Sequence, residues 1–128
     1  MHQLTVIGLG AADFDQLQMG VYKQLKQAKK LYVRTEDHPV LHDLKEEGVV
    51  FSSFDYVYEK HDTFAPVYKE IAALLIEAAK EEPIMYAVPG HPLVAEQTVQ
   101  HLIEAADEGQ VQLKIEGGQS FLDPIFGA

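Results

Sequence analysis

The uninterrupted apolar segment Ile84–Val88 constrains the fold of this chain more than any other feature of its sequence. A strand with no polar residue has no face to turn toward solvent, which is typical of a central strand in a parallel sheet that is covered on both sides. The segment ends at residues 89–92 (Pro-Gly-His-Pro), and apolar residues then recur at helical spacing over residues 94–106. A buried strand that leads through a short turn into a helix predicts an α/β domain.

Strands and helices alternate along the rest of the chain, with short connections between them. Apolar and β-branched residues cluster at four further predicted strands, residues 4–7, 31–33, 49–51 and 111–115. Apolar residues recur at helical spacing in three further predicted helices, residues 17–30, 39–47 and 64–79. Gly48 and Gly109 are expected to end two of the helices, and residues 52–62 are interpreted as a loop because they are aromatic and acidic without a clean period. This order predicts an α/β fold with a mostly parallel sheet flanked by helices.

The composition of the 128-residue chain excludes several classes of protein. A hydrophobic fraction of 47% argues against intrinsic disorder, and the absence of Cys excludes disulfide scaffolds, thiolate zinc sites and thiol nucleophiles. A formal net charge of −10 argues against nucleic-acid binding, which needs clustered basic residues. No apolar run is long enough for a membrane span, and the N-terminus lacks the pattern of a secretory signal. We therefore expect a cytoplasmic protein that binds neither nucleic acid nor membrane.

Half of the ten basic residues lie between Lys23 and Arg34, whereas the remainder of the chain is strongly acidic. A local basic face that attracts an anion is one interpretation of this segment. The solvated flank of a helix is the plainer interpretation.

The first candidate binding segment is the turn that follows the first strand, Gly-Leu-Gly-Ala-Ala-Asp at positions 8–13. In open α/β sheets, ligands bind beyond the carboxyl ends of the strands, where glycines let the backbone approach closely. The turn lacks the Gly-Lys-Ser/Thr ending of a phosphate-binding loop, and Asp13 stands where a dinucleotide fingerprint has its third glycine. Glu36 and Asp37 nevertheless follow the second strand, where an acidic residue would hold a ribose. A structural turn capped by Asp13 or Asp15 is an equal alternative.

The second candidate binding segment is the turn at residues 89–92, between the most apolar strand and a helix. Pro92 fits the first helical position, which places Gly90 and His91 at the helix N-terminus. Backbone N–H groups at such an end bind carbonyl or carboxylate oxygens. A helix-start turn with a solvent-facing histidine is the alternative, but the position at the carboxyl end of a strand favours a binding site.

Other chemically suggestive residues carry weaker signals. His38 and His42 have the spacing of a metal-binding pair, but a proline lies between them and no zinc motif accompanies them. Phe54, Tyr56 and Tyr58 could line a pocket, although packing is the more common role of alternating aromatic residues. No serine lies in a strand-to-helix elbow. The sequence therefore nominates no catalytic residue and no metal site.

The two glycine-containing turns, in this order and at this separation, resemble the first half of the tetrapyrrole (corrin/porphyrin) methylase family. These class III S-adenosyl-L-methionine-dependent methyltransferases typically begin with a strand and Gly-x-Gly-Pro-Gly-Asp, and later carry Gly-Asp-Pro followed by an aliphatic pair. The corresponding segments here are Gly-Leu-Gly-Ala-Ala-Asp at positions 8–13 and Gly-His-Pro-Leu-Val at positions 90–94. The second variant is most similar to the methylase-like domain that is joined to a MazG-type nucleoside triphosphate pyrophosphohydrolase.

The resemblance implies two α/β domains that hold the methyl donor, S-adenosyl-L-methionine, in the cleft between them. Residues 1–116 would form the N-terminal domain, and residues 117–128 the linker and the start of a truncated C-terminal domain. Matching positions imply a donor site made of Ala11, Gly90, His91, Val94, Ser120 and Phe121. They also imply a trough for the methyl acceptor shaped by Gly8, Gly10 and Asp13. His91 replaces the aspartate usual in the family, which removes a carboxylate from beside the positively charged donor, and Ala11-Ala12 replaces the usual Pro-Gly.

Three functional hypotheses follow. The first is the N-terminal half of a methyltransferase that acts on an unidentified small molecule and is inactive as an isolated fragment. The second is a non-catalytic ligand-sensing or docking module attached to a MazG-type pyrophosphohydrolase, and the third is a dinucleotide-binding domain. The resemblance further implies a homodimer, and a fragment without its second domain is expected to be marginally stable or self-associating because apolar surface is uncovered.

Overall fold

The computed structural model describes residues 2–9, 19–36, 39–88 and 97–117. Five strands lie within these ranges: β1 (Gln3–Gly8), β2 (Leu31–Val33), β3 (Ser52–Ser53), β4 (Ile84–Val88) and β5 (Gln112–Gly117). The helices are α1 (Met19–Gln27), α2 (Pro39–Glu46), α3 (Asp55–Lys60), α4 (Phe64–Glu81) and α5 (Gln97–Asp107). The strands form one sheet in the order β3-β2-β4-β1-β5, and every pair of neighbours is parallel. The predicted α/β fold, a parallel sheet flanked by helices, is confirmed.

Strand β4 lies in the middle of the sheet, between β2 and β1, and all its residues are buried. Ile84, Tyr86 and Val88 belong to the hydrophobic core on one face of the sheet. Met85 and Ala87 belong to the core on the other face. Because side chains of a strand alternate between faces, a strand covered on both sides needs an apolar residue at every position. The predicted central strand is therefore confirmed.

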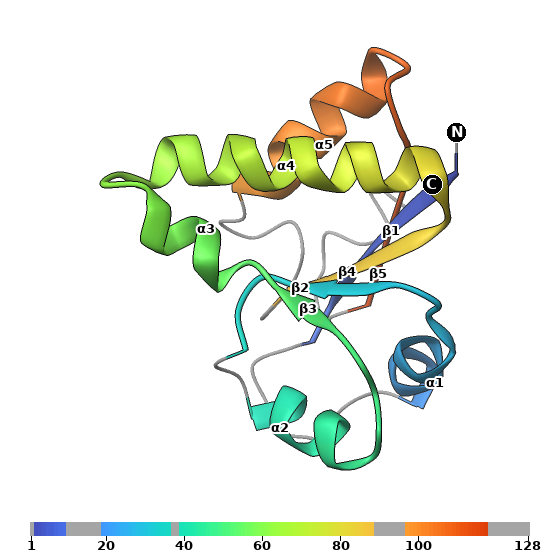
Figure 1. Cartoon of the computed structure of the whole chain (residues 1–128). Helices are drawn as coiled ribbons and strands as arrows, with labels where there is room; N and C mark the ends of the chain where they lie inside the picture. Colours follow the sequence, from blue (N-terminus) through green and yellow to red (C-terminus); the bar gives the residue numbers. More distant parts are fainter. Residues whose placement is uncertain (1, 10–18, 37–38, 89–96, 118–128) are drawn as a thin grey trace.

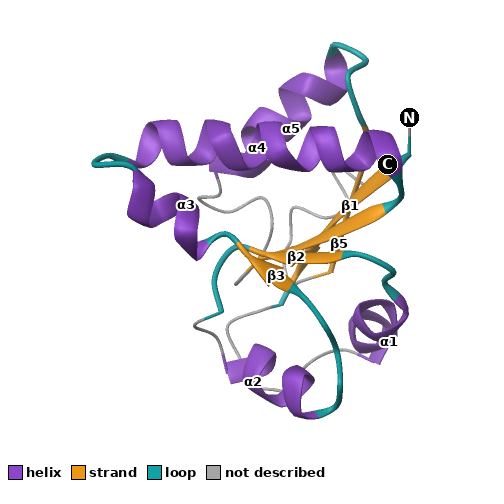
Figure 2. Cartoon of the chain, in the orientation of Figure 1, coloured by secondary structure: helices purple, strands orange, loops and turns teal. Residues whose placement is uncertain are grey.

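Helices cover both faces of the sheet (Figure 1). Helices α3, α4 and α5 lie on one face, and α1 and α2 lie on the other, as the colouring by secondary structure in Figure 2 makes clear. The long helix α4 buries Val67, Ile71 and Leu75 in the first core. On the second face, α1 buries Leu25 and α2 buries Leu44. Residues three and four positions apart share one side of a helix, so each helix presents an apolar stripe to the sheet.

Three helix boundaries follow from residues with special backbone preferences. Helix α2 begins at Pro39, whose fixed φ suits the first helical position. Gly48 and Gly109 follow α2 and α5 with φ of +90° and +80°, a left-handed conformation that side chains disfavour. The Gly48 N–H donates to the Lys45 carbonyl at 3.1 Å, and the Gly109 N–H donates to the Ala106 carbonyl at 3.0 Å. The helix ends predicted at the two glycines are confirmed.

Two sequence-based predictions between α2 and α4 are wrong. The third strand is Ser52–Ser53 rather than residues 49–51, where Val50 is 87% exposed. The predicted loop at residues 52–62 contains this strand and the helix α3. Phe54 and Val57 are buried three residues apart, a pattern too short to be recognised among aromatic and acidic neighbours. Packing on the sheet, rather than a long periodic stripe, stabilises a helix of this length.

The other elements end within three residues of their predicted bounds wherever the structure describes them. The predicted helix starts at Leu17 and Val94 lie outside the described residues. In the described part of the chain, no helix combines the length and the hydrophobicity that crossing a bilayer requires.

Candidate functional site

The carboxyl ends of β1 and β4 lie side by side in the sheet. Gly8 is the register partner of Val88, and the Leu9 N–H donates a hydrogen bond of 2.8 Å to the Val88 carbonyl. From β1 the chain continues toward α1 on one face, and from β4 it continues toward α5 on the other (Figure 1). Neighbouring strands whose connections leave to opposite faces create a crevice beyond their carboxyl ends, where open α/β sheets bind ligands.

Gly8 is a predicted trough residue that the structure describes. It ends β1 between Val88 of β4 and Gly117 of β5, so three strand ends meet at this position. The other predicted site residues lie outside the described residues: Gly10, Ala11, Asp13, Gly90, His91, Val94, Ser120 and Phe121. The segments that carry them continue from Leu9, Val88 and Gly117, whose positions the structure brings to one edge of the sheet.

Buried residues fix the described ends of these connections. Leu9 is buried directly after β1. Beyond residues 89–96, Thr98 of α5 is fully buried, and its hydroxyl donates to the Tyr68 carbonyl of α4 at 3.5 Å. Val99 and Leu102 of the same helix are also buried, so α5 packs against the core. These contacts hold the carboxyl edge of the sheet in place, as a binding site built there would require.

A pocket of about 340 Å³ lies at the same edge of the sheet, beside the carboxyl end of β2. Its lining residues come from the segment after β2 and from α3 and α4: Arg34, Thr35, Asp55, Tyr58, Phe64 and Tyr68. Arg34 directly follows β2, and its N–H donates to the Ala87 carbonyl of β4 at 3.2 Å. The sequence-based analysis considered Tyr58 as a pocket residue but did not nominate Arg34 or Thr35, although the rule that ligands bind after strand ends, applied to β2, points to them.

Asp55, the first residue of α3, ties the segment after β2 to the helix layer. Its Oδ2 accepts a hydrogen bond from the Glu36 N–H at 3.0 Å, and the side chains of Thr35 and Ser53 also bond to the carboxylate. Burial raises the pKa of this carboxyl, but the three hydrogen bonds outweigh burial and hold the pKa below its ordinary value of 3.8. The carboxylate is therefore charged at neutral pH and fixes the backbone on which Arg34 lies.

Three aromatic rings meet where α3 and α4 line the pocket. Phe64 stacks on Tyr68 with ring centroids 6.1 Å apart, and Tyr58 packs edge-on against the two rings at 6.3 and 6.4 Å. Of the aromatic residues considered from the sequence, Tyr58 thus lines a pocket. Phe54 has the packing role, because it is buried and stacks on Tyr32 at 5.4 Å.

A surface cluster of charges joins the end of α3 to α4. Glu70 of α4 accepts a hydrogen bond of 2.6 Å from Lys60 Nζ and lies 2.7 Å from His61 Nε2. The bond from Lys60, followed by that with His61, holds the pKa of the Glu70 carboxyl below its usual range. This cluster links the end of α3 to α4 beside the contact between Tyr58 and Tyr68.

The strand order contradicts the dinucleotide hypothesis. In the dinucleotide-binding fold, β2 is a neighbour of β1, so an acidic residue after β2 reaches a ribose held at the turn after β1. Here β4 separates β1 from β2. The Glu36 N–H is bonded to Asp55, and Asp37 lies outside the described residues. The acidic pair therefore follows a strand that does not border the first glycine turn.

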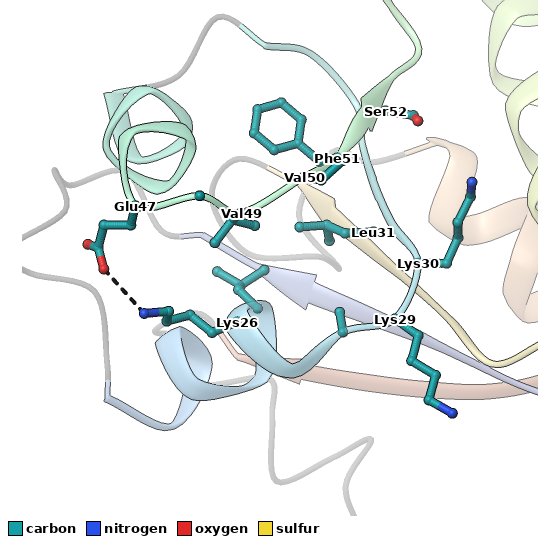
Figure 3. A pocket seen from close by; sticks show the side chains of 12 residues that line it. Lys26, Lys29, Lys30, Leu31, Glu47, Val49, Val50, Phe51 and Ser52 are labelled. Atoms are coloured by element: carbon teal, nitrogen blue, oxygen red, sulfur yellow. Dashed lines mark ion pairs between the residues drawn. The ribbon is translucent and has the colours of Figure 1, made fainter.

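The basic residues between Lys23 and Arg34 are divided between two edges of the sheet. Lys26, Lys29 and Lys30 line a second pocket, of about 370 Å³, at the amino ends of β2 and β3. Lys29 and Lys30 point in different directions, and Lys26 pairs with Glu47 at 3.5 Å (Figure 3). Helices α1 and α2 end at this pocket, and lysines complement the carbonyl ends of helices. The arrangement favours the solvated flank over an anion site.

A family model described as Tetrapyrrole (Corrin/Porphyrin) Methylases matches residues 3–123 of the chain. The chain belongs to this family. It is also 55% identical over 124 residues to the uncharacterized protein YabN of Bacillus subtilis (strain 168). That match covers 97% of this chain and 25% of YabN, so the chain spans about a quarter of the length of this curated relative. The family resemblance inferred from the two turns is confirmed.

Solved structures of methylase-fold proteins superpose on the chain. A crystal structure of diphthine synthase matches 98% of this chain and 47% of its own, with a TM-score of 0.68 and 25% identity. Uroporphyrin-III C-methyl transferase from Thermus thermophilus, complexed with S-adenyl homocysteine, matches 97% of this chain and 51% of its own, with a TM-score of 0.63 and 19% identity. The chain thus shares the methylase fold and spans about half the length of these structures.

Proposed function

We propose that this chain is the N-terminal half of a S-adenosyl-L-methionine-dependent methyltransferase. Its family membership supports this function, as does the S-adenyl homocysteine in the related Thermus thermophilus structure. In this proposal, residues 1–116 form one wall of the donor site, and a second α/β domain, reached through the linker at residues 117–128, forms the other. The two-fold greater length of the matched structures supports a two-domain arrangement.

The hydrogen bond from the Leu9 N–H to the Val88 carbonyl is the observation that best supports the proposal. It joins the ends of β1 and β4, from which the two family-like segments continue, at the point where the connections leave to opposite faces of the sheet. A ligand held beyond these strand ends can contact both segments at once.

The charge of the chain fits a cationic donor. S-adenosyl-L-methionine supplies an electrophilic methyl group on a positively charged sulfonium sulfur. A net charge of −10 attracts such a donor and repels a polyanionic acceptor. Lys26, Lys29 and Lys30 lie at the opposite edge of the sheet and do not reverse this balance.

The residues of this chain position the reactants rather than react with them, since methyl transfer requires donor and acceptor to be close, in line and shielded from water. In the proposal, the donor lies against Ala11, Gly90, His91, Val94, Ser120 and Phe121. Gly8, Gly10 and Asp13 shape the trough for the acceptor. His91 contributes a hydrogen bond where the family's usual aspartate would also contribute a negative charge.

The proposed setting is a cytoplasmic homodimer that acts on a small molecule, with a MazG-type pyrophosphohydrolase domain further along the protein. The setting rests on the family resemblance. The length of YabN, of which the match covers 25%, is compatible with additional domains.

Calorimetric titration of the full-length protein, with the proposed second domain attached, with S-adenosyl-L-methionine and with S-adenosylhomocysteine tests the proposal. Both ligands are expected to bind. His91→Asp should tighten binding of the sulfonium donor about tenfold, equivalent to about 1.4 kcal/mol, and affect the uncharged thioether product much less, because the added carboxylate faces a positive charge only in the donor. His42→Asp, the same change at an exposed position of α2, is the matched control and should leave both affinities unchanged.

Absence of binding by both ligands to the folded full-length protein would reject the donor site. Equal effects of His91→Asp on donor and product would remove His91 from contact with the sulfonium.

A further inference from the structure

The pocket beside β2 combines chemical groups in the way that small-molecule sites do. Guanidinium, hydroxyl, carboxylate and aromatic groups share its lining: Arg34, Thr35, Asp55, Tyr58, Phe64 and Tyr68. Its volume of about 340 Å³ lies at the lower end of the range for ligand pockets, roughly 300–1,000 Å³. The pocket therefore suits a compact ligand with both an apolar and a polar part.

The aromatic rings provide a stacking surface. Phe64 lies on Tyr68 with an interplanar angle of 18°, and Tyr58 supports the pair from its edge. Phe64 is 65% exposed, so it contributes little to the core and remains accessible beside the pocket. An accessible ring backed by a second, nearly parallel ring is typical of sites that stack a planar ligand.

Arg34 supplies the charge that selects the ligand. Its guanidinium has five N–H donors in one plane, a geometry that matches a carboxylate or a phosphate. The Asp55 carboxylate, which also lines the pocket, accepts hydrogen bonds from the Glu36 N–H and from Thr35 and Ser53. The pocket thus pairs a ring-stacking wall with an anion-binding side chain.

The pocket adjoins the proposed donor edge. The Arg34 N–H is bonded to the Ala87 carbonyl, and the next residue of β4, Val88, accepts the bond from Leu9. Arg34 is therefore separated from the end of β1 by a single strand, β4. A part of the acceptor that extends from the proposed trough at Gly8 past the end of β4 would reach this pocket.

We propose that this pocket binds the methyl acceptor, and that the acceptor carries a planar heteroaromatic system of one or two fused rings and an anionic group, as a nucleotide does. The role of the pocket as an acceptor site rests on the proposed methyltransferase function. Its ability to bind a planar ring that carries an anionic group does not depend on that function.

Calorimetric titration of the full chain with guanosine 5′-monophosphate tests this proposal, in the presence and absence of saturating S-adenosylhomocysteine. Guanine differs from the adenine of the donor, so the probe does not mimic it. Two control ligands each contain one part of the probe: guanosine lacks the phosphate, and ribose 5-phosphate lacks the ring. We expect the nucleotide to bind about tenfold or more tightly than either part, and to bind in the presence of S-adenosylhomocysteine.

Two variants with matched controls locate the binding. Phe64→Ala should weaken nucleotide binding about fivefold or more through lost stacking, and Arg34→Gln about tenfold through the lost bidentate pair. Tyr56→Ala removes an exposed aromatic ring outside the pocket, and Lys29→Gln removes a cation at the opposite edge; both should leave the affinity unchanged. Circular dichroism verifies that each variant is folded.

No nucleotide binding, or binding that is insensitive to both Phe64→Ala and Arg34→Gln, would overturn the assignment of the pocket. Displacement of the nucleotide by S-adenosylhomocysteine would overturn it as well, because the probe would then occupy the donor site. Nucleotide binding with the expected variant effects, but without any binding of S-adenosylhomocysteine, would support the ring-and-anion pocket while rejecting its role in methyl transfer.

Discussion

At the scale of single residues, Asp55 stabilises the carboxyl edge of the sheet through several hydrogen bonds. It connects the start of α3 to the segment after β2 through the Glu36 N–H, and this segment also carries Arg34. Carboxylates that accept several hydrogen bonds stabilise the folded state in their charged form. The charged Asp55 carboxylate thus stabilises the segment that directly follows Arg34.

Asp55→Asn should lower the free energy of unfolding by about 1 kcal/mol at pH 7, because charge-assisted hydrogen bonds are lost at a partly exposed position. The folded-state pKa of Asp55 is depressed, so its contribution is complete above the ordinary value of 3.8 and is lost as the pH falls through the lower folded-state pKa. Urea unfolding at pH 7 and pH 3 should thus show a difference from the parent chain that shrinks in acid.

Asp62→Asn, the same substitution at an exposed residue between α3 and α4, is the control and should have little effect at either pH. An Asp55→Asn deficit that persists undiminished at pH 3 would show that the carboxylate charge does not contribute.

The residues at the carboxyl edge differ in how well they can be predicted from the sequence. Gly8 could be predicted because a glycine after a β-branched strand is a strong turn signal. The sequence did not show that Arg34 and Asp55 line one pocket, since they are 21 positions apart and Asp55 lies in a segment interpreted as loop. Their association depends on a short helix that packing on the sheet creates.

At the scale of helices and strands, glycines determine where helices end. Gly109 follows α5 with φ of +80°, whereas Gly20 lies within α1 without a positive φ. Apart from the adjacent backbone, no atom of the described residues lies within 4 Å of a Cβ built at either position. Alanine substitutions at the two sites therefore differ in backbone conformation and not in steric clash.

Gly109→Ala should lower the free energy of unfolding by about 1 kcal/mol, because alanine is strained in the left-handed region. Gly20→Ala should raise it by about 0.5–1 kcal/mol, because alanine loses less backbone entropy in a helix. Denaturant midpoints of the two variants measured side by side test the opposite signs. A neutral or stabilising Gly109→Ala would contradict the left-handed helix end.

Long apolar patterns predicted their elements, and short ones did not. Helix α4 has buried residues at regular spacing through Val67, Ile71 and Leu75, which its sequence shows directly. Strand β3 consists of two serines that pair with β2, and nothing in their chemistry indicates a strand. Residues 49–51 have the apolar, β-branched composition of a strand, yet pairing with β2 occurs after them.

At the scale of the whole molecule, the strand order determines the site. The alternation of strands and helices predicts a parallel sheet but not which strands are neighbours, because several orders satisfy the same pattern. The observed order places β4 beside β1, which brings the strand ends from which the two glycine-containing segments continue to one edge and separates β1 from β2. That order supports a methyl-donor site and contradicts a dinucleotide site.

Backbone amide chemical shifts of the ¹⁵N-labelled chain, recorded while S-adenosylhomocysteine is added, test the location of the donor site most directly. The account predicts that the largest changes occur at Gly8, Leu9 and Val88, and that amides near Lys29 and Gly48 at the opposite edge stay unchanged. Largest changes at the Lys29 edge, or no changes at a saturating concentration, would contradict a donor site between the ends of β1 and β4.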